Sequence, residues 1–215
     1  MSNFLYLIKN KSLKKKDRKI LIMLHGYGSN YNDLISLSDF FGDDFIYISI
    51  QANHSLDLNS YCWWSLHFDV NNKIQSNFDQ AKNSAESLNK FIQNDIIQKY
   101  NIRNENIILM GFSQGAMLAY ALSLNFYDNY KKVIGLSGKI IEEIINLCSN
   151  DKYKDHKFYC SHGLFDQTIP VSNAREASKW FNKNKIDHKY QEFQSQHNLS
   201  MENIEAVKDW LKNIN

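Results

Sequence analysis

The stretch NIILMGFSQGAMLAYALSL, residues 106–124, decides the fold. Its first part, residues 106–110, is a short apolar run that predicts a strand buried on both faces of a sheet. From Gln114 to about Leu124, apolar side chains recur at helical spacing, which predicts a helix. Ser113 is therefore expected in a very short strand-to-helix turn, with a glycine two residues away on either side.

Strands and helices alternate over most of the chain. The predicted strands are residues 19–24, 45–50, 106–110, 132–137, 157–162 and 188–193, and the amphipathic stretches 78–100, 173–184 and about 199–211 add helices to the one after Ser113. This alternation indicates an α/β protein with a mostly parallel central sheet and helices on both faces. Residues 51–76 have weak periodicity and are expected to form a long loop, which in compact domains is often functional.

Composition narrows the class of protein. The chain has 215 residues, 43% hydrophobic, and a net charge of +2, which suit one domain with a substantial core. The basic piece KNKSLKKKDRK, residues 9–19, is interpreted as a solvated turn between two strands rather than a surface for nucleic acid or membrane.

Nothing in the sequence predicts export, a membrane span or a metal site. No apolar run approaches the roughly 20 residues needed to cross a bilayer, and no signal peptide is recognised. The cysteines, Cys62, Cys148 and Cys160, are scattered, so we expect free thiols in a reducing compartment and a cytoplasmic protein. No CxxC or HExxH spacing points to a metal.

The turn at Ser113 has the pattern that nucleophilic catalysis needs. A serine hydroxyl attacks a carbonyl only when a base takes its proton. In a Gly-x-Ser-x-Gly turn between a strand and a helix, the serine is lifted clear of the sheet, and glycines avoid collisions in a crowded bend. The N-terminus of the following helix also directs free N–H groups to this place. We therefore predict that Ser113 is a nucleophile.

A base and an acid should follow later in the chain, each just past a strand. Asp166 lies directly after the strand predicted at 157–162, and His197 follows the strand predicted at 188–193. His197 would take the proton of Ser113, and Asp166 would orient the imidazole. Other acidic and histidine side chains fit the positions or the order less well: Asp151, Asp155, Asp187, His156, His162 and His188.

Acyl transfer also needs N–H donors for the oxyanion. One is expected from the residue after the nucleophile, Gln114, and the other from an early loop after a strand. The sequence LHGYGSN, residues 24–30, provides such a loop, with the N–H of Tyr27 as the natural donor. His25, at a strand end beside a glycine, is expected to have a packed, hydrogen-bonded structural role instead of acting as a base.

Four motifs together resemble one family. LHGYGSN, GFSQGAMLAYAL, GLFDQTIP and the late His197 resemble the phospholipase/carboxylesterase family of α/β-hydrolases, which includes bacterial carboxylesterases and acyl-protein thioesterases. The resemblance implies an α/β-hydrolase fold as a single domain over residues 1–215, without metal or organic cofactor, and makes a homodimer plausible. The site residues that it implies are the triad Ser113, Asp166 and His197, the oxyanion donors Tyr27 and Gln114, and Trp63 or Trp64 beside an acyl pocket.

The chain departs from the family pattern near the pocket. Gln196 stands where the family usually has a glycine before the catalytic histidine, so this loop is expected to be stiffer or differently shaped. Residues 51–53 lack the proline that often follows the second strand, and residues 51–62 are poor in glycine. These differences bear on pocket shape more than on the chemistry.

The expected function is that of a serine hydrolase that cleaves carboxylic esters through an acyl-serine intermediate. Within the family, hydrolysis of lysophospholipids and of thioesters on acylated proteins are the alternatives, and the triad does not separate them. A hydrolase of amides, peptides or C–C bonds would share the same serine chemistry. A binding protein without activity on this fold would be expected to lose part of the triad, which this chain keeps.

Overall fold

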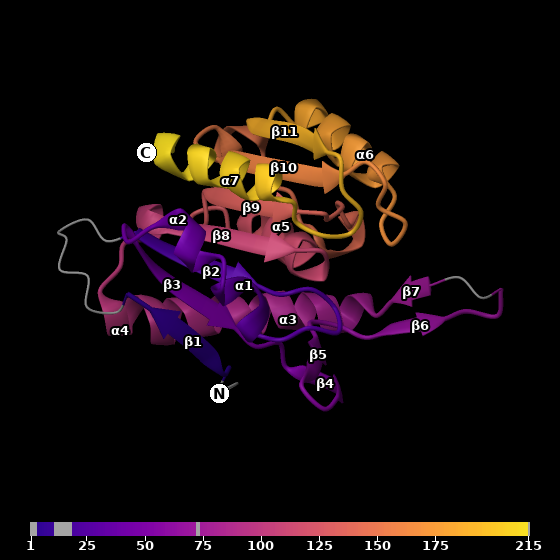
Figure 1. Cartoon of the computed structure of the whole chain (residues 1–215), viewed down its shortest axis with the longest axis horizontal. Coiled ribbons are helices and arrows are strands. Elements are labelled where there is room, and N and C mark those ends of the chain that lie inside the picture. Colours follow the sequence, from indigo (N-terminus) through magenta and orange to yellow (C-terminus); the bar gives the residue numbers. More distant parts are fainter. Residues whose placement is uncertain (1–3, 11–18, 72–73, 215) are drawn as a thin grey trace.

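A seven-stranded sheet forms the centre of the protein. In the computed structural model, which describes residues 4–10, 19–71 and 74–214, the strand order is β1-β3-β2-β8-β9-β10-β11 (Figure 1). Neighbouring strands are parallel, except for β1, which runs antiparallel to β3 at one edge. The predicted mostly parallel sheet is therefore confirmed.

The strands of the main sheet are β1 (Tyr6–Lys9), β2 (Lys19–Leu24), β3 (Phe45–Ile50), β8 (Ile107–Phe112), β9 (Lys132–Leu136), β10 (Lys157–Gly163) and β11 (His188–Phe193). The α-helices are α1 (Asn32–Ile35), α2 (Ser38–Phe41), α3 (Phe78–Phe91), α4 (Gln98–Tyr100), α5 (Gln114–Asn125), α6 (Val171–Lys183) and α7 (Met201–Asn213). Single turns of 3₁₀-helix cover Asn104–Asn106, Glu142–Ile144 and Asn150–Tyr153. The predicted strands and helices are thus present, with boundaries that differ by a few residues.

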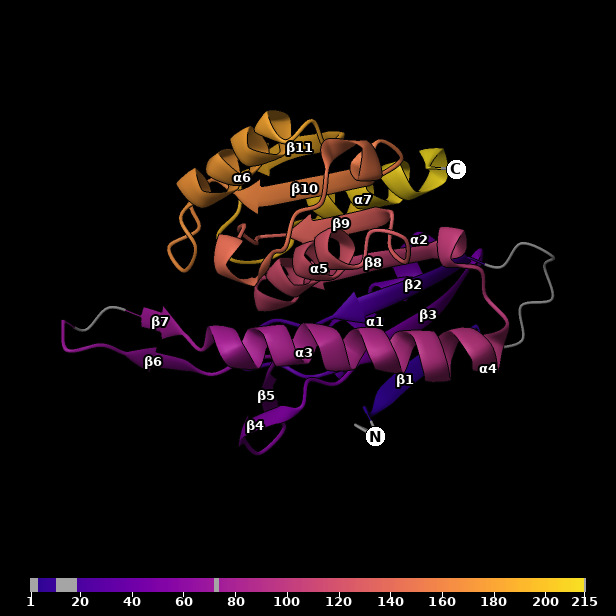
Figure 2. The same ribbon diagram turned by 180° about the vertical axis from the view of Figure 1, so that it is seen from behind.

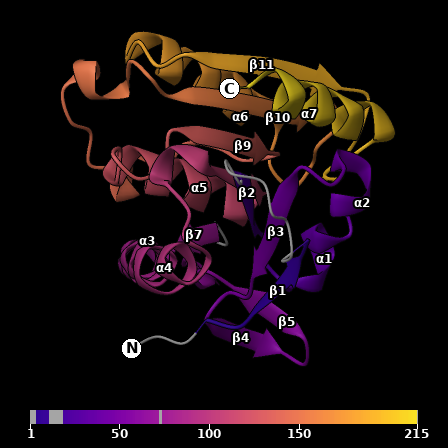
Figure 3. The ribbon, with the colours of Figure 1, turned by 90° about the vertical axis from the view of Figure 1, so that its left-hand side faces the viewer.

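Helices cover both faces of the sheet. Helices α3, α5 and α6 lie on one face (Figure 2), and α1, α2 and α7 lie on the other (Figure 1). Seen along the sheet, the two helical layers lie on opposite sides of the strands (Figure 3). Side chains alternate across a strand, so that Ile20 and Ile22 of β2 join one core cluster while Leu21 and Met23 join the other. Because helices cover both faces of the sheet, successive residues of these strands are apolar instead of alternating with polar ones.

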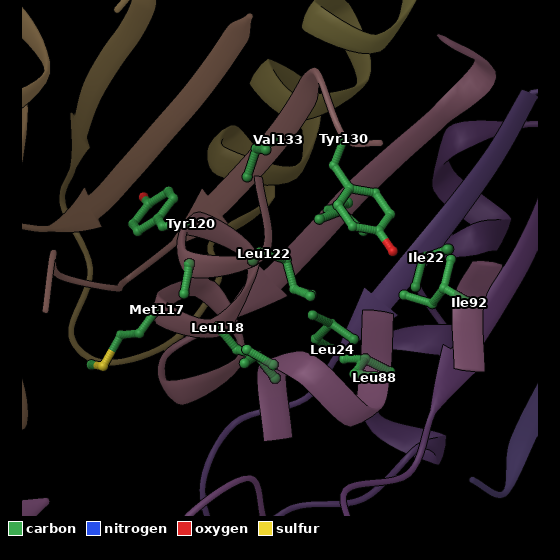
Figure 4. Packing of buried hydrophobic residues seen from close by; sticks show 14 of the residues in the cluster. Ile22, Leu24, Leu88, Ile92, Met117, Leu118, Tyr120, Leu122, Tyr130 and Val133 are labelled. Carbon is green, nitrogen blue, oxygen red and sulfur yellow. The ribbon is translucent and has the colours of Figure 1, made fainter. Parts of the chain in front are cut away.

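The core under α5 is made by side chains from distant parts of the chain. Leu118 and Leu122 of α5 lie close to Leu24 of β2 and Leu88 of α3 (Figure 4). Because α5 packs between the sheet and its neighbours, nearly all of its residues are buried, including the polar Gln114. The helix that follows Ser113 is therefore fixed by packing.

The stripe predicted at 78–100 is one long helical segment. Asn77 caps its start by accepting a hydrogen bond from the N–H of Gln80 at 3.0 Å. Between α3 and α4, Ile92–Ile97 form a π-helical stretch, and the segment ends at Asn101, which has a left-handed φ of 50°.

The prediction of a long loop over residues 51–76 was wrong. This region holds two antiparallel hairpins, β4 (His54–Asp57) with β5 (Ser60–Cys62), and β6 (Leu66–Phe68) with β7 (Ile74–Ser76). Short strands with few alternating apolar residues give little periodicity, which explains the error. The β6–β7 hairpin projects from the end of the molecule toward which β8 and β10 point (Figure 1).

The N-terminal region was also incompletely predicted. A strand before the basic piece was expected only as one flank of a turn, without bounds; in the structure it is β1, which pairs antiparallel with β3 at the edge of the sheet. Most of the basic turn predicted at 9–19 lies outside the described residues, although β1 and β2 flank it as expected. Among the helices that the structure describes, none has the length and apolar character needed to cross a bilayer.

Candidate active site

Ser113 occupies a strained turn between β8 and α5. Its backbone has φ 54° and ψ −116°, a left-handed conformation that is rare for residues other than glycine. The turn is held because the Ser113 N–H donates to the carbonyl of Leu136 on β9 at 2.8 Å. Since α5 begins at Gln114, the serine side chain stands at the N-terminal end of a well-packed helix.

The two flanking glycines are required by close backbone contacts. A Cβ on Gly111 would lie 2.2 Å from the carbonyl oxygen of Gly115, and a Cβ on Gly115 would lie 2.0 Å from that of Leu24. The helix start therefore touches both β8 and β2, which explains the Gly-x-Ser-x-Gly spacing physically.

One imidazole joins the serine to a carboxylate. His197 Nε2 lies 3.0 Å from Ser113 Oγ, and His197 Nδ1 lies 2.6 Å from Asp166 Oδ2. The three residues come from the turns that follow β8, β10 and β11, so the carboxyl ends of these strands bring them together. The three predicted side chains thus form one continuous hydrogen-bonded chain, and with Nδ1–H donating to the carboxylate, Nε2 is left to accept from the hydroxyl.

Asp166 is buried and held on both oxygens. Its side chain has no exposed surface. The Oδ1 atom accepts from the N–H groups of Thr168 and Ile169 at 2.9 and 2.8 Å, while Oδ2 faces His197 and, at 3.2 Å, Nε2 of His162. These donors hold the carboxylate in one orientation as a hydrogen-bond acceptor.

His162 is a neutral neighbour of this chain of hydrogen bonds. Burial lowers its pKa, only partly opposed by its hydrogen bond to the carbonyl of Ile169, which lies 2.7 Å from Nε2. Because Nε2 faces two acceptors, it carries the proton, and Nδ1 is left without a partner among the described residues. From the sequence, His162 was considered only as a rival base, and no pattern indicated its contact with Asp166.

The two predicted oxyanion donors lie beside Ser113. Tyr27 and Gln114 line the same pocket as Ser113 and His197. Within the described ranges, neither backbone N–H donates a hydrogen bond to a backbone carbonyl. Both N–H groups are therefore available to a ligand oxygen.

His25 has the structural role that was predicted. It is fully buried, its Nδ1–H donates to the carbonyl of Gly26 at 2.8 Å, and its Nε2 accepts from the N–H of Ala52 at 3.1 Å. Burial lowers its pKa, so the ring is neutral and holds the loop before Tyr27 against the end of β3.

The side chain of Gln114 attaches the tryptophan pair to the turn. Its Oε1 accepts from the N–H of Trp63 at 2.8 Å, and its Nε2 donates to the carbonyl of Trp64 at 2.8 Å. Trp63 is fully buried, and its indole N–H donates to the carbonyl of His25 at 2.9 Å, away from the pocket. Trp64, and not Trp63, is among the described residues that line the pocket.

The pocket at Ser113 has a volume of about 340 Å³ and is mostly apolar. Besides Ser113, His197, Tyr27 and Gln114, the residues that line it are Trp64, Leu66, Ile74, Ser76, Met117, Lys139, Thr168 and Ile169. Leu66, Ile74 and Ser76 come from the β6–β7 hairpin, which is part of the region predicted as a loop. A pocket of this size and polarity fits a small substrate with an apolar part.

The loop that carries His197 approaches the end of β10 closely. A Cβ on Gly163 would lie 2.2 Å from the carbonyl oxygen of Gln196. Gln196 itself has no left-handed φ, so an ordinary residue fits where the family usually has glycine. The close approach depends on Gly163, a position that the sequence analysis did not single out.

The two buried cysteines do not compete with Ser113 as nucleophiles, and the described residues contain no cluster of metal ligands. Burial raises the pKa of the Cys62 thiol to about 11 and that of Cys160 to about 12, so both remain protonated. Searched over the described residues, the structure contains no group of three or more histidine, cysteine, aspartate or glutamate side chains able to hold a metal ion.

The sheet order, the helices on its two faces and the turn after β8 define the chain as an α/β-hydrolase. The model of the Phospholipase/Carboxylesterase family matches residues 8–215, and the chain belongs to this family.

Known proteins agree with this assignment. The chain is 25% identical over 211 residues to acyl-protein thioesterase 1 of Kluyveromyces lactis, covering 90% of this chain and 91% of the relative. The fold is similar to a carboxylesterase from Mesorhizobium loti, with a TM-score of 0.83 at 15% identity over 98% and 95% of the two chains. A carboxylesterase of Bacillus cereus gives a TM-score of 0.80 at 18% identity over 97% and 93%.

Proposed function

We propose that this protein hydrolyses carboxylic esters through an acyl-serine intermediate, with Ser113, His197 and Asp166 as the catalytic triad. The observation that carries the proposal is the single imidazole between Ser113 Oγ at 3.0 Å and Asp166 Oδ2 at 2.6 Å. Membership of the phospholipase/carboxylesterase family supports the same reaction.

The reaction follows from the direction of these hydrogen bonds. His197 Nε2 takes the hydroxyl proton while Ser113 Oγ attacks the ester carbonyl, and Asp166 stabilises the imidazolium. The N–H groups of Tyr27 and Gln114 bind the oxyanion. When the C–O bond breaks, His197 gives the proton to the leaving alcohol, and a serine ester remains. Water, deprotonated by His197, then attacks this ester; the bond from the acyl carbon to Ser113 Oγ breaks, His197 gives its proton to Oγ, and the acid is released.

Thioester cleavage is the second candidate, because a relative aligned over 90% of the chain is an acyl-protein thioesterase. A thiolate leaves more easily than an alkoxide, so the same side chains serve both reactions. Trp64, as a wall of the pocket, would contact the acyl chain in either case.

The test is a panel of p-nitrophenyl esters of increasing chain length, a lysophospholipid and an acyl thioester, with Ser113→Ala as the blank. We expect ester turnover that Ser113→Ala abolishes, and labelling of Ser113 by a fluorophosphonate. Equal labelling of the Ser113→Ala protein would overturn the proposal. The substrate with the highest kcat/KM decides between ester, lysophospholipid and thioester.

We also propose a cytoplasmic location, on the basis of three free cysteines, two of them buried. A fluorescent fusion with fractionation tests this location. A homodimer and the single-domain organisation of residues 1–215 remain predictions, which analytical ultracentrifugation and limited proteolysis would test.

A further inference from the structure

The turn after β9 packs directly on the Ser113 turn. Ser137 has a left-handed φ of 52°, and its N–H donates to the carbonyl of Ser161 at 2.8 Å. A Cβ on Gly138 would lie 2.6 Å from Cβ of Ala116 and 3.5 Å from the carbonyl oxygen of Ser113. The next residue is Lys139, whose backbone is therefore held beside the reactive serine.

Lys139 is the one basic side chain among the described residues that line the pocket, apart from His197. It is half-buried and lines the same pocket as Ser113, His197 and Thr168. The described ion pairs hold Lys9, Lys131, Lys157 and Lys212 against aspartates, but they include none for Lys139. Its ammonium group is therefore not neutralised by a carboxylate of the described residues.

The pocket does not offer Lys139 an internal acid. No aspartate or glutamate is among the described residues that line it. The adjacent Asp166 is fully buried, and its two oxygens already accept from Thr168, Ile169 and His197. In a small pocket with apolar walls, one unopposed cation favours a ligand with negative charge.

We propose that Lys139 selects esters that carry an anionic group, a carboxylate or a phosphate, in the part of the substrate that occupies this pocket. This inference rests on the proposed ester hydrolysis and specifies its substrate class. The ammonium group donates hydrogen bonds to the anion and thereby orients the ester carbonyl toward Ser113 Oγ. Apolar side chains such as Met117 and Ile169 contact the carbon chain that joins the anionic group to the ester.

The experiment compares substrates that differ only in charge. Monoethyl adipate against ethyl hexanoate places a carboxylate on the acyl side, and acetoxyethyl phosphate against butyl acetate places a phosphate on the alcohol side. Acid release is followed in a pH-stat for the wild type, Lys139→Met, Lys139→Arg and Lys139→Glu. Lys183→Met, an exposed lysine on α6, is the matched control.

For at least one pair, Lys139→Met should lower the ratio of kcat/KM for the anionic ester to that for the neutral ester by about tenfold. Lys139→Glu should lower it further, Lys139→Arg should largely keep it, and Lys183→Met should leave it unchanged. The pair that responds tells which side of the ester enters the pocket. Added salt should weaken the preference of the wild type more than that of Lys139→Met.

Equal ratios in the wild type and Lys139→Met for both pairs, with turnover that still needs Ser113, would overturn the role of Lys139 and leave the proposed function standing. If no ester were cleaved in a Ser113-dependent way, the proposed function would fail instead. A Lys139→Met protein that does not fold leaves the decision to Lys139→Glu and Lys139→Arg, which must differ in the ratio.

Discussion

Nε2 of His162 lies 3.2 Å from Oδ2 of Asp166, the oxygen that also binds His197 at 2.6 Å. The same His162 nitrogen lies 2.7 Å from the carbonyl of Ile169. One neutral imidazole therefore ties the end of β10 to the loop that holds the carboxylate. The geometry makes His162 a positioning residue for Asp166.

We expect His162→Phe to lower kcat about tenfold while KM changes little, because the lost donor is near the carboxylate and outside the substrate pocket. His162→Gln can place an N–H donor near the original Nε2 and should recover most of the rate. Steady-state kinetics of both variants check this. A His162→Gln protein as slow as His162→Phe, or a change confined to KM, would contradict the positioning role.

Asp166→Asn should keep the fold but lose kcat by a factor on the order of 10⁴. An amide in this place still accepts from Thr168 and Ile169, but its NH₂ group would face His197 Nδ1 and favour the tautomer with the proton on Nε2. That nitrogen could then no longer take the proton of Ser113. Kinetics and circular dichroism measure the two effects, with the exposed Asp187→Asn as control. Near-normal turnover by Asp166→Asn would move the acid role to another residue.

Gln114 is proposed to act through its backbone N–H and, separately, through its side chain, and one substitution can distinguish the two roles. Its backbone N–H is a proposed oxyanion donor, and its side chain holds Trp63 and Trp64. Gln114→Ala keeps the N–H but leaves two buried backbone groups without partners, so we expect a loss of about 1–3 kcal/mol in the free energy of unfolding. Urea unfolding checks the stability. Because Trp64 lines the pocket, KM should rise more than kcat falls; a large fall in kcat alone would argue against this division.

The arrangement of the central elements could be predicted from sequence because each signal was local. The buried runs in β2, β3 and β8, the glycines around Ser113, and the placement of Asp166 and His197 after strands all follow from short-range rules. The convergence of the three side chains then follows from the carboxyl ends of parallel strands.

The structural features that could not be predicted from the sequence depend on contacts between residues that are far apart in the chain. The β6–β7 hairpin has strands of only three residues, and β1 is stabilised by its pairing with β3. His162, Lys139 and Gly163 carry no pattern of their own, since their roles depend on Asp166, the pocket and Gln196. Trp63 and Trp64 could not be told apart from the sequence; in the structure Trp64 lines the pocket, and the indole N–H of Trp63 donates to the carbonyl of His25.

Stability should fall in acid because buried histidines resist protonation. His156 is fully buried against Tyr153 and Phe158, and burial, with Lys131 nearby, lowers its pKa to about 4. As pH falls from the ordinary value of about 6.5 toward 4, the unfolded chain binds a proton that the folded chain does not, so the folded state loses stability through this window. His25 and His162, whose pKa values are also lowered by burial, act in the same direction.

His156→Phe isolates this contribution. The loss of unfolding free energy between about pH 7.5 and about pH 4.5 should be smaller than in the wild type by about 2 kcal/mol. Urea unfolding at the two pH values measures the difference, and an exposed histidine replaced in the same way, His67→Phe, serves as the control. An identical pH dependence of His156→Phe and the wild type would show that this ring is protonated in the folded protein.

The distance between the loops of Asp166 and His197 depends on Gly163. Its hydrogen occupies a place where a methyl group would lie 2.2 Å from the carbonyl oxygen of Gln196 and 2.5 Å from that of Ser195. Both neighbours are backbone atoms, so Gly163→Ala must push the loop of His197 away from β10. A displacement of about 1 Å at a reacting group can cost about 10² in rate, and we expect at least this loss in kcat, measured by steady-state kinetics.

The matched control is Gly42→Ala. Gly42 has a φ of 89°, and no atom lies within 4 Å of the added Cβ. That change should therefore cost only about 1–2 kcal/mol of backbone strain and leave kcat intact. Normal kcat in Gly163→Ala would mean that the loop shifts without moving the imidazole from Ser113.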